Sequence, residues 1–315
     1  MPTLRKAEAV VMDEPGRIAV RSVQLVGEPS ADVEVEMLWS GISTGTERLL
    51  WSGRMPPFPG LGYPLIPGYE SVGRVTRGAG SLASGDLVFV PGARCFGDIR
   101  GLFGGAASHV IVPHEKLIPV PDGMGEEAVL LALAATAHHA LTLDGVRPPD
   151  IIVGHGVLGR LLARLTIAFG HGAPRVWDKN PDRLSGTNGY TAAAPDEKPL
   201  GEARSIYDVS GNPDCINALV PHLEHGGEIV LAGFYDRPLA FDFPPAFMRE
   251  ARFRIAAEWK PNDLRTVLDL ISTGALDVSG LITHRFRPSE AEDAYHTTFE
   301  DVSCLKTVLD WRAAA

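Results

Sequence analysis

Residues 150–180 constrain the fold most, because they combine a strand, a glycine turn, a helix and a second strand. The β-branched run 151–153 leads into a G-x-G-x-x-G turn, and the apolar run 161–169 follows with helical spacing. In this context the turn predicts a dinucleotide site, whose free helix N–H groups favour a pyrophosphate. The predicted cofactor-binding residues of the turn are Gly154, Gly156, Val157, Leu158 and Gly159.

A carboxylate follows the second strand of this stretch. Asp178 lies 24 residues after Gly154, near the spacing of the acid that accepts hydrogen bonds from the adenosine ribose hydroxyls. Its charge disfavours a 2′-phosphate, which favours NAD over NADP. Lys179 and Arg183 favour the opposite choice, because nearby cations accommodate the extra phosphate.

The composition indicates a globular protein with substantial cores. The 315 residues allow two domains, and 45% of them are apolar. The formal net charge of −10 argues against nucleic acid or an anionic membrane as the main partner. Three widely spaced cysteines predict neither a disulfide framework nor a Cys-rich zinc site. Because residues 1–16 lack the apolar core of a signal peptide and the apolar run 128–143 contains two histidines, we expect a cytoplasmic protein without a membrane-spanning segment.

The order of short segments predicts two domains of an α/β fold. Residues 1–120 contain β-branched and alternating stretches separated by Gly and Pro, as is typical of a barrel-like or sandwich-like β domain. Residues 121–258 alternate between helix and strand patterns, which favours a doubly wound parallel Rossmann sheet. Residues 259–315 end in an isolated strand, so we expect this segment to return to the β-rich catalytic domain.

Periodicity and turn residues also locate the individual elements. The expected strands are 8–12, 33–39, 70–76, 87–90, 108–112, 151–153, 174–177, 205–209, 228–233, 252–257, 282–286 and 305–309. The expected helices are 128–143, 161–169, 213–223, 261–273 and 288–299.

Short motifs resemble those of the medium-chain dehydrogenase/reductase superfamily. SGISTGTE at 40–47 resembles its Gly-Ile-Cys motif, PGYESVG at 67–73 resembles its Gly-His-Glu motif, and residues 132–141 resemble the helix after its third metal-ligand position. The resemblance covers nearly the whole chain. It implies a GroES-like catalytic domain, a Rossmann domain and a homodimer formed through the nucleotide-binding domain.

A longer string resembles one branch of this superfamily, the bacteriochlorophyllide dehydrogenases of phototrophs. It consists of WSGISTGTE at 39–47, LWSGRMPPFPG at 50–60 and GYPL at 62–65, with GLFGGA at 101–106 in addition. The resemblance implies a bacteriochlorophyllide-type tetrapyrrole as substrate. Its 1-hydroxyethyl group would be oxidised to acetyl, with NAD as hydride acceptor, in bacteriochlorophyll biosynthesis.

Zinc-dependent members of the superfamily hold their catalytic ion with Cys, His and Cys, and this chain lacks all three ligands. The matching positions are Ser43, Tyr69 and, from the alignment of the helix, Ala132. A hydroxyl, a phenol and a methyl group do not form the three-ligand site that catalytic zinc requires. We therefore predict no metal cofactor.

Without a metal, alcohol oxidation needs a group that takes the hydroxyl proton, while the cofactor carries the redox step. Tyr69 occupies a former ligand position and is the first candidate, although its phenol needs a neighbouring positive charge to act as a base at neutral pH. Ser43 and Thr46 are candidates for a hydroxyl relay or for simple turn residues. His138 is a candidate because histidine is a common proton acceptor, although a lone His on an apolar helix is more often a core residue. The remaining candidates, which can instead brace their loops, are Glu47 and Glu70.

Large apolar and aromatic residues near these positions predict a substrate pocket, because a flat macrocycle binds through broad aromatic contact. The alternative is that they pack the β domain. The pocket candidates are Trp39, Trp51, Met55, Phe58 and Tyr63.

Three further residues are expected at the cofactor. Ser210 and Gly233 follow predicted strands, and ligands of open α/β sheets bind at the carboxyl ends of strands. Thr136 is expected near the nicotinamide, because the superfamily resemblance implies it.

Two other functions remain open at this point. One is a zinc-free quinone or enone reductase of the same superfamily that takes NADPH, which the cation pair near Asp178 would suit. The other is a non-catalytic pigment-binding protein on a dehydrogenase scaffold, against which the intact glycine turn argues.

Overall fold

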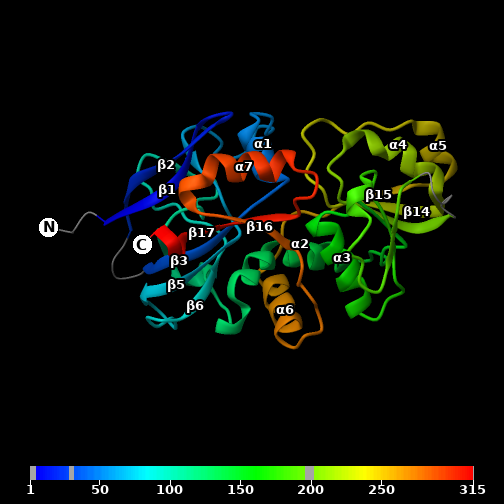
Figure 1. Ribbon diagram of the computed structural model, residues 1–315. Coiled ribbons are helices and arrows are strands. Elements are labelled where there is room, and N and C mark those ends of the chain that lie inside the picture. Colours follow the sequence, from blue (N-terminus) through cyan, green and yellow to red (C-terminus); the bar gives the residue numbers. More distant parts are fainter. Residues whose placement is uncertain (1–4, 28–31, 196–201, 315) are drawn as a thin grey trace. The chain divides into compact units, whose positions relative to one another are not determined.

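The computed structural model describes residues 5–27, 32–195 and 202–314 of the chain. The first four residues of the stretch 1–16, in which we expect no signal peptide, lie outside the described residues. The chain forms two compact units: unit 1 comprises residues 1–132 and 281–315, and unit 2 comprises residues 133–280. Unit 1 therefore contains both the blue and the red ends of the chain in Figure 1.

Unit 1 is built mainly from antiparallel strands. Its elements are β1 (Arg5–Glu14), β2 (Arg17–Leu25), β3 (Asp32–Ile42), α1 (Thr46–Trp51), β4 (Leu65–Ile66), β5 (Ser71–Arg77), β6 (Leu87–Val90), β7 (Arg100–Gly101), β8 (His109–Pro113), β9 (Ile118–Pro119), β16 (Ile282–Phe286), α7 (Ala291–Glu300) and β17 (Lys306–Asp310). The described strands form one sheet in the order β2-β1-β4-β7 and a larger one in the order β16-β17-β3-β5-β6-β9, in which β8 also pairs with β3.

Strand β3 organises the core of unit 1. Val33, Val35 and Met37 are buried on one face of the strand, in the two-residue period of a half-buried strand. Each such side chain contributes roughly 1.5–3 kcal/mol when it is fully buried. The C-terminal strand β17 pairs antiparallel with β3, with Leu309 opposite Ser40. The last segment of the chain thus holds the end of β3 in place.

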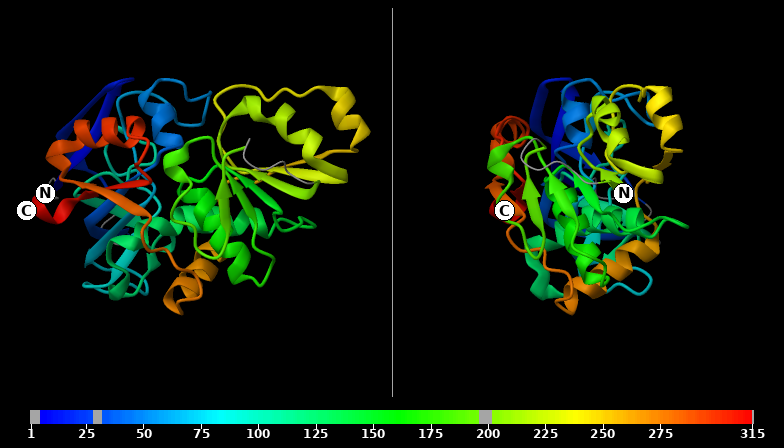
Figure 2. Two further views of the ribbon diagram at one scale, coloured as in Figure 1. Left: turned by 45° about the vertical axis from the view of Figure 1, so that its right-hand side comes forward. Right: turned by 90° about the vertical axis from the view of Figure 1, so that its right-hand side faces the viewer.

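Unit 2 is a parallel sheet with helices. Its elements are α2 (Leu131–Leu141, which begins in unit 1), β10 (Ile151–Val153), α3 (Val157–Ala168), β11 (Arg175–Trp177), β12 (Thr191–Ala193), β13 (Ala203–Asp208), α4 (Ile216–Leu219), β14 (Leu223–Leu231), α5 (Phe243–Met248), β15 (Arg252–Ile255) and α6 (Pro261–Ser272). All described pairings in the order β12-β11-β10-β13-β14-β15 are parallel, and the strands lie side by side in Figure 2. This confirms the predicted α/β class.

The strand order also locates the binding edge of unit 2. From β10 the chain continues to β11 and β12 on one side of the sheet, and then returns to β13, β14 and β15 on the other. Dinucleotides bind at such a switch point, outside the carboxyl ends of the strands. The glycine turn follows β10 and therefore lies at this edge.

Some elements differ from the expectations. The stretch 213–223 is not one helix, because two 3-10 turns flank the four-residue α4, and Pro221 cannot donate a helical hydrogen bond. The strand expected at 228–233 begins earlier, at Leu223, with a register shift against β13. Strand β2 was missed, and the connection between β11 and β12 contains no α-helix among its described residues.

The unit boundaries also differ from the expected domains 1–120, 121–258 and 259–315. Residues 121–132 belong to unit 1, because the 3-10 helix Asp122–Leu130 packs against β3, β5 and β6. Residues 259–280 belong to unit 2, where Asp263 of α6 bonds to His138 and His139 of α2.

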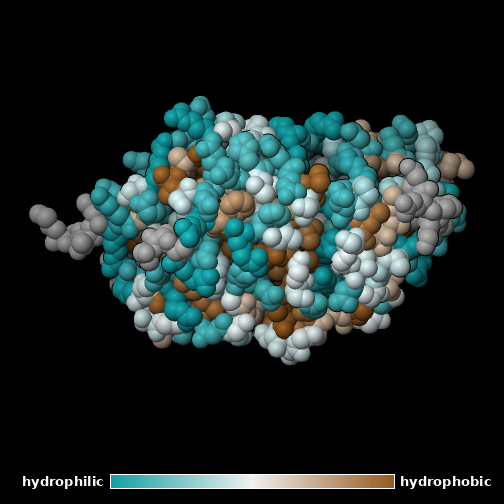
Figure 3. Space-filling model, in the orientation of Figure 1, coloured by the Kyte–Doolittle hydropathy of each residue, from teal (hydrophilic) through white to brown (hydrophobic). Residues whose placement is uncertain are grey.

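Hydrophilic residues dominate the face drawn in Figure 3. Among the described residues, no helix has the length and apolar character needed to cross a membrane.

Candidate active site

Three hydroxyl groups of unit 1 meet between the end of β3, the start of α1 and the start of β5. Ser43 Oγ lies 2.8 Å from Tyr69 Oη, and Thr46 Oγ1 lies 3.5 Å from the same atom. Ser43 is buried, whereas Thr46 and Tyr69 are half-buried. We call Ser43, Thr46 and Tyr69 the hydroxyl cluster. The structure thus brings together three of the candidate catalytic residues, each able both to donate and to accept a hydrogen bond.

The environment of Tyr69 disfavours the phenolate. Burial raises the pKa of Tyr69 above its ordinary value, and the neighbouring charge of Glu70 raises it further, against the smaller lowering effect of the Ser43 hydrogen bond. A base role for Tyr69 requires the opposite direction of shift. The direction of this shift favours the protonated phenol at neutral pH, so it does not favour Tyr69 as the resting base, and the catalytic role of Tyr69 stays a prediction.

Glu70 is a structural brace of the site. Its carboxylate forms a fully buried ion pair with Lys306 of β17, whose Nζ also donates to the carbonyl of Ile42 at 3.2 Å. The backbone N–H of Gly41 donates to the carbonyl of Glu70 at 2.7 Å. These bonds join β17, the end of β3 and the start of β5. Lys306 lies 236 residues from Glu70 in the sequence, and nothing local to its strand indicates this partner.

Glu47 forms a second buried contact beneath the hydroxyl cluster. It accepts hydrogen bonds from the Ser43 N–H at 3.2 Å and from the Tyr295 hydroxyl at 2.6 Å. Burial raises the pKa of Glu47 to about 7, and the charge of Glu70 adds to the effect. Glu47 therefore fixes the backbone of Ser43 and changes its charge close to neutral pH.

A row of half-buried aromatic rings leads away from the hydroxyl cluster. The ring of Tyr69 contacts Phe103 edge to face, with 5.3 Å between centroids, and Phe103 contacts Phe58 with 6.1 Å between centroids. All three side chains are half-buried. We call Tyr69, Phe103 and Phe58 the aromatic row. Phe58 was a pocket candidate, whereas Phe103 was only part of the string at 101–106 and was missed.

Two other pocket candidates belong to the core. Trp39 and Met55 are each only 8% exposed. The ring of Trp39 is covered by the guanidinium of Arg312, 4.6 Å from its centroid, a favourable cation–π contact. Their burial favours the alternative that these two residues pack the β domain.

The last two pocket candidates pack against neighbouring elements of unit 1. Trp51 contacts His296 and Phe299 of α7, at centroid distances of 5.0 and 5.7 Å. The hydroxyl of Tyr63 donates to the carbonyl of Leu50. Both residues are half-buried and pack against the hydrophobic core of unit 1.

In unit 2 the glycine turn has the geometry that a pyrophosphate requires. Gly154 has φ +106°, and a Cβ on Gly159 would lie 1.9 Å from the carbonyl oxygen of Gly154, so neither position tolerates a side chain. A Cβ on Gly156 would meet only Nη1 of Arg183, at 3.9 Å. Val157 and Leu158 open α3, whose N-terminus has no side-chain cap. Its first N–H groups are therefore left for an anionic ligand.

Asp178 follows β11 and touches the glycine turn. Its Oδ2 accepts the His155 N–H at 2.7 Å, and its Oδ1 accepts the Asn180 N–H at 2.9 Å. These bonds fix the carboxylate while leaving lone pairs for ribose hydroxyls. The residues of the turn and Asp178 thus fit a nicotinamide dinucleotide.

Ser210 and Gly233, which are predicted to lie at the cofactor, follow the ends of β13 and β14. The Ser210 N–H donates to Oδ1 of Asp208, and the Gly233 N–H donates to the Asp208 carbonyl at 3.0 Å. A Cβ on Gly233 would lie 2.8 Å from the N of Gly211. Asp208 therefore joins the two strand ends, a link that the sequence analysis missed.

His138 is engaged inside unit 2. Its Nδ1 lies 2.6 Å from Asp263, which also bonds to His139 at 3.1 Å, and its ring packs on Phe169 at 5.5 Å. Side chains two residues apart on a helix point in directions that differ by about 200°. His138 and the half-buried Thr136 therefore do not face the same site. These contacts favour a structural role for His138 over the catalytic one.

The donor set of the hydroxyl cluster does not suit zinc, because catalytic zinc takes His, Cys or carboxylate ligands. In the described ranges, His, Cys, Asp and Glu form no group of three or more that could hold a metal ion. Positions 43, 69 and 132 carry Ser, Tyr and Ala.

The fold and the two sites together define a class of alcohol dehydrogenase. Residues 29–122 match the alcohol dehydrogenase GroES-like domain. The fold is similar to a solved alcohol dehydrogenase of Escherichia coli CFT073 in complex with NADH, with a TM-score of 0.81, 19% identity and coverage of 97% of this chain and 99% of the other. This confirms the GroES-like part of the predicted fold.

Two curated relatives identify the family more closely. The 2-desacetyl-2-hydroxyethyl bacteriochlorophyllide A dehydrogenase of Rhodobacter capsulatus is 50% identical over 98% of this chain and 99% of its own length. The protein of the same name from Cereibacter sphaeroides is also 50% identical, over 98% of this chain and 100% of its own length. The chain therefore belongs to the bacteriochlorophyllide dehydrogenase family of the medium-chain dehydrogenases/reductases.

Proposed function

We propose that this chain oxidises the 1-hydroxyethyl group of a bacteriochlorophyllide to an acetyl group. The observation that carries the proposal is the 50% identity over nearly full length to dehydrogenases named for that substrate. In this reaction the carbinol carbon loses a hydride and its hydroxyl loses a proton, which leaves a ketone. The proposed hydride acceptor, NAD, supplies the redox chemistry when it is bound.

The hydroxyl cluster provides a path for the proton. Tyr69 accepts a hydrogen bond from the carbinol hydroxyl while its own hydroxyl donates to Ser43 Oγ, 2.8 Å away. A proton can then move along the chain of hydroxyls without a charged phenolate at rest. Tyr69 can alternatively donate its proton to Thr46 Oγ1, 3.5 Å away, and because Thr46 is half-buried this second branch gives the proton an outlet to water.

The aromatic row provides the contact surface for the pigment. Phe103 and Phe58 are half-buried and continue directly from Tyr69. A macrocycle that covers these rings would lose apolar contact with water and place a peripheral side chain at the hydroxyl cluster. The row is therefore the proposed substrate surface of unit 1.

Asp178 supports NAD rather than NADP as the cofactor. Its carboxylate is fixed by two backbone N–H groups at the end of β11. A carboxylate so placed accepts hydrogen bonds from ribose hydroxyls and repels a 2′-phosphate. Faster turnover with NADP than with NAD would instead favour the reductase alternative.

The experiment is an oxidation assay with the purified chain. It uses hydroxyethyl bacteriochlorophyllide a with NAD or NADP, before and after treatment with a chelator, and follows the pigment spectrum. We expect acetyl product with NAD and no effect of the chelator. Binding of the pigment without product in the presence of NAD would support the non-catalytic alternative.

Variants test the hydroxyl cluster. Tyr69→Phe and Ser43→Ala should each lower kcat by about 10-fold or more, because each breaks the proton path. Tyr207→Phe is the matched control: its hydroxyl donates to the Arg147 carbonyl at 2.8 Å within unit 2, so kcat should not change. Near-normal kcat in both hydroxyl-cluster variants would contradict the relay.

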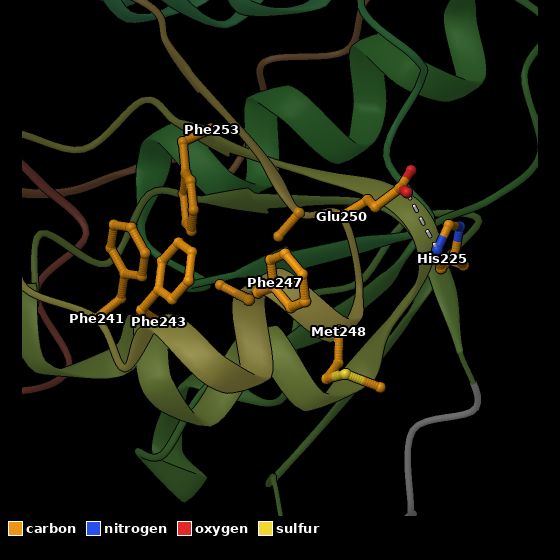
Figure 4. Close-up of a pocket in the computed structure, with 9 residues that line it drawn as sticks. His225, Phe241, Phe243, Phe247, Met248, Glu250 and Phe253 are labelled. Carbon is orange, nitrogen blue, oxygen red and sulfur yellow. Dashed lines mark ion pairs between the residues drawn. The ribbon is translucent and has the colours of Figure 1, made fainter.

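We also propose a homodimer formed through unit 2. Strand β15 is the last described strand of its sheet, and an open groove beside it is lined by apolar side chains of α5 and its flanks, including Phe241, Phe243 and Phe253 (Figure 4). Exposed edges and apolar patches of this kind are typical of protein interfaces. The strongly exposed apolar residues of this face are Phe243 (66%), Phe247 (64%), Met248 (71%) and Ile255 (76%).

A further inference from the structure

The connection from β11 to β12 is unusual for a parallel sheet. Parallel neighbours are normally joined by a crossover helix, but residues 178–190 contain only a 3-10 helix at Pro181–Arg183. Without a helix, the backbone carbonyls of this segment need other partners. Because the segment begins with Asp178, whatever holds it also shapes the proposed adenosine site.

Arg160 supplies those partners from α3. Its guanidinium donates to the carbonyls of Arg183 at 3.1 Å, Ser185 at 2.8 Å and Gly186 at 2.9 Å, and its Nε donates to the His155 carbonyl at 3.1 Å. Gly186 has φ +74°, and a Cβ there would lie 2.3 Å from the guanidinium. Arg160 is buried. One buried side chain therefore ties the segment to the glycine turn.

His155 and Tyr190 close the same contact from the other side. Burial, together with the charge of Arg160, lowers the pKa of His155 to about 4, so the imidazole is neutral at pH 7. A neutral ring donates through one nitrogen and accepts through the other. Nδ1 bonds to the carbonyl of Arg183, so it carries the proton, and Nε2 accepts from the Tyr190 hydroxyl at 2.8 Å.

The charge of this group favours an anionic ligand. Arg160 lies in the first turns of α3, where the helix dipole is also positive, and its bonds to described residues all go to carbonyls, with no carboxylate in ion-pair range. A second cation is close by, because Nη1 of Arg183 would lie 3.9 Å from a Cβ on Gly156. A phosphate at the turn would offset this positive charge.

We propose that His155, Arg160 and Tyr190 are positioning residues for the cofactor, and that Arg183, which they hold beside Gly156, binds its pyrophosphate. These residues take the place of the crossover helix and fix Asp178 and Arg183 around the adenosine diphosphate half. Arg183 then raises the affinity for NAD and NADP equally, which leaves the choice between them to Asp178. The inference rests on the proposed nicotinamide cofactor but not on the identity of the alcohol.

Binding of ADP-ribose to the full chain tests the positioning role without a pigment substrate. Tyr190→Phe removes the hydroxyl that donates a hydrogen bond to His155 and keeps the aromatic ring. It should weaken ADP-ribose binding by about 3- to 10-fold, the usual effect of one buried hydrogen bond, and raise the KM for NAD equally while kcat stays unchanged. The matched control Tyr207→Phe removes another buried hydroxyl of unit 2 and should leave the affinity unchanged. If both variants lower the melting temperature and neither changes the affinity, the role is only structural and the inference is overturned.

Arg183→Gln tests whether Arg183 binds the pyrophosphate of the cofactor. The variant should lose affinity for ADP-ribose and for 2′-phospho-ADP-ribose by the same factor. A loss confined to the 2′-phosphate ligand, or no loss, would overturn the assignment to the pyrophosphate. If the unmodified chain binds neither ligand, the proposed cofactor fails and the inference with it. Normal binding without pigment oxidation would refute only the proposed substrate.

Discussion

Replacing Glu47 by glutamine should stabilise the protein at pH 8 more than at pH 5. Burial raises the pKa of Glu47 from 4.5 in a model peptide to about 7 in the folded chain. Between these pH values the folded state keeps a proton that the unfolded chain has released, so the free energy of unfolding falls as pH rises. The difference between the two pKa values corresponds to about 3 kcal/mol at pH 8.

Glutamine removes the titration and keeps both contacts. Its carbonyl oxygen can accept the Ser43 N–H, and its amide can donate to the Tyr295 oxygen, in place of the two bonds that Glu47 makes. Part of the pH effect is already present at pH 5. The free energy of unfolding of the variant, relative to that of the unmodified chain, should therefore rise by about 2–3 kcal/mol between pH 5 and pH 8. For a unit of this size that is a shift of roughly 6–10 °C in melting temperature.

Scanning calorimetry of both proteins at pH 5, 6, 7 and 8 measures this gain. Glu115→Gln is the control, because Glu115 is exposed and its substitution should give a small difference at every pH. The reasoning would be refuted by a Glu47→Gln difference that is constant with pH, or larger at pH 5 than at pH 8. Either result would mean that the folded chain holds Glu47 ionised at pH 5.

Two further predictions concern unit 2. The pKa of buried His155 is lowered to about 4, so His155 is protonated in the unfolded chain before it is protonated in the folded chain as pH falls. The free energy of unfolding should therefore decrease by at most about 3 kcal/mol between pH 6.5 and pH 4. Urea unfolding of His155→Gln should show a smaller decrease over the same pH range. Phe247→Asp should convert the proposed dimer to a monomer in light scattering, because Phe247 is 64% exposed on the apolar face. Val302→Asp, at a 55% exposed position of unit 1, is the control; a monomeric unmodified chain would exclude this dimer.

The elements that could be predicted are those with a local pattern. The glycine turn lies between β10 and α3 as expected, because the β-branched run 151–153 and the apolar helix that follows specify their own periods. Strand β2 was missed, because Arg17–Leu25 is half polar and buries only some of its side chains. The stretch 213–223 was expected to be one helix although Pro221 interrupts its hydrogen bonding.

The contacts that could not be predicted join residues far apart in the sequence. The superfamily resemblance assigned Ser43 and Tyr69 to former metal-ligand positions, and the structure brings these two residues together with Thr46. The direction of the Tyr69 pKa depends on burial and on Glu70, and the partner of Glu70 is Lys306 in the last strand. No periodicity relates these positions.

The crossover of unit 2 did carry a signal that periodicity alone does not use. Residues 184–190 read LSGTNGY, with two glycines and no helical spacing, and Arg160 follows directly after the glycine turn in the largely apolar helix α3. A buried arginine in an apolar helix needs acceptors. A neighbouring segment without a helix offers free carbonyls, so the two features together indicate the contact that Arg160 makes.

The buried charges of the two units differ in a way that matches the proposed reaction. In unit 1 the cation of Lys306 is neutralised by Glu70, and the raised pKa of Glu47, about 7, leaves this carboxyl only partly ionised at neutral pH, so little fixed charge lies beside the hydroxyl cluster. A carbinol that enters neutral and leaves as a neutral ketone requires no fixed counter-charge. In unit 2 the hydrogen bonds of buried Arg160 to described residues all go to carbonyls, and the charge of Asp178 is opposed by those of Arg164 and Arg183, so an additional anion nearby would lower the cost of burying the guanidinium. The proposed pyrophosphate supplies that anion. Phosphate should therefore raise the thermal stability of the unmodified chain more than that of Arg160→Met, because the variant no longer has the charge that the anion offsets.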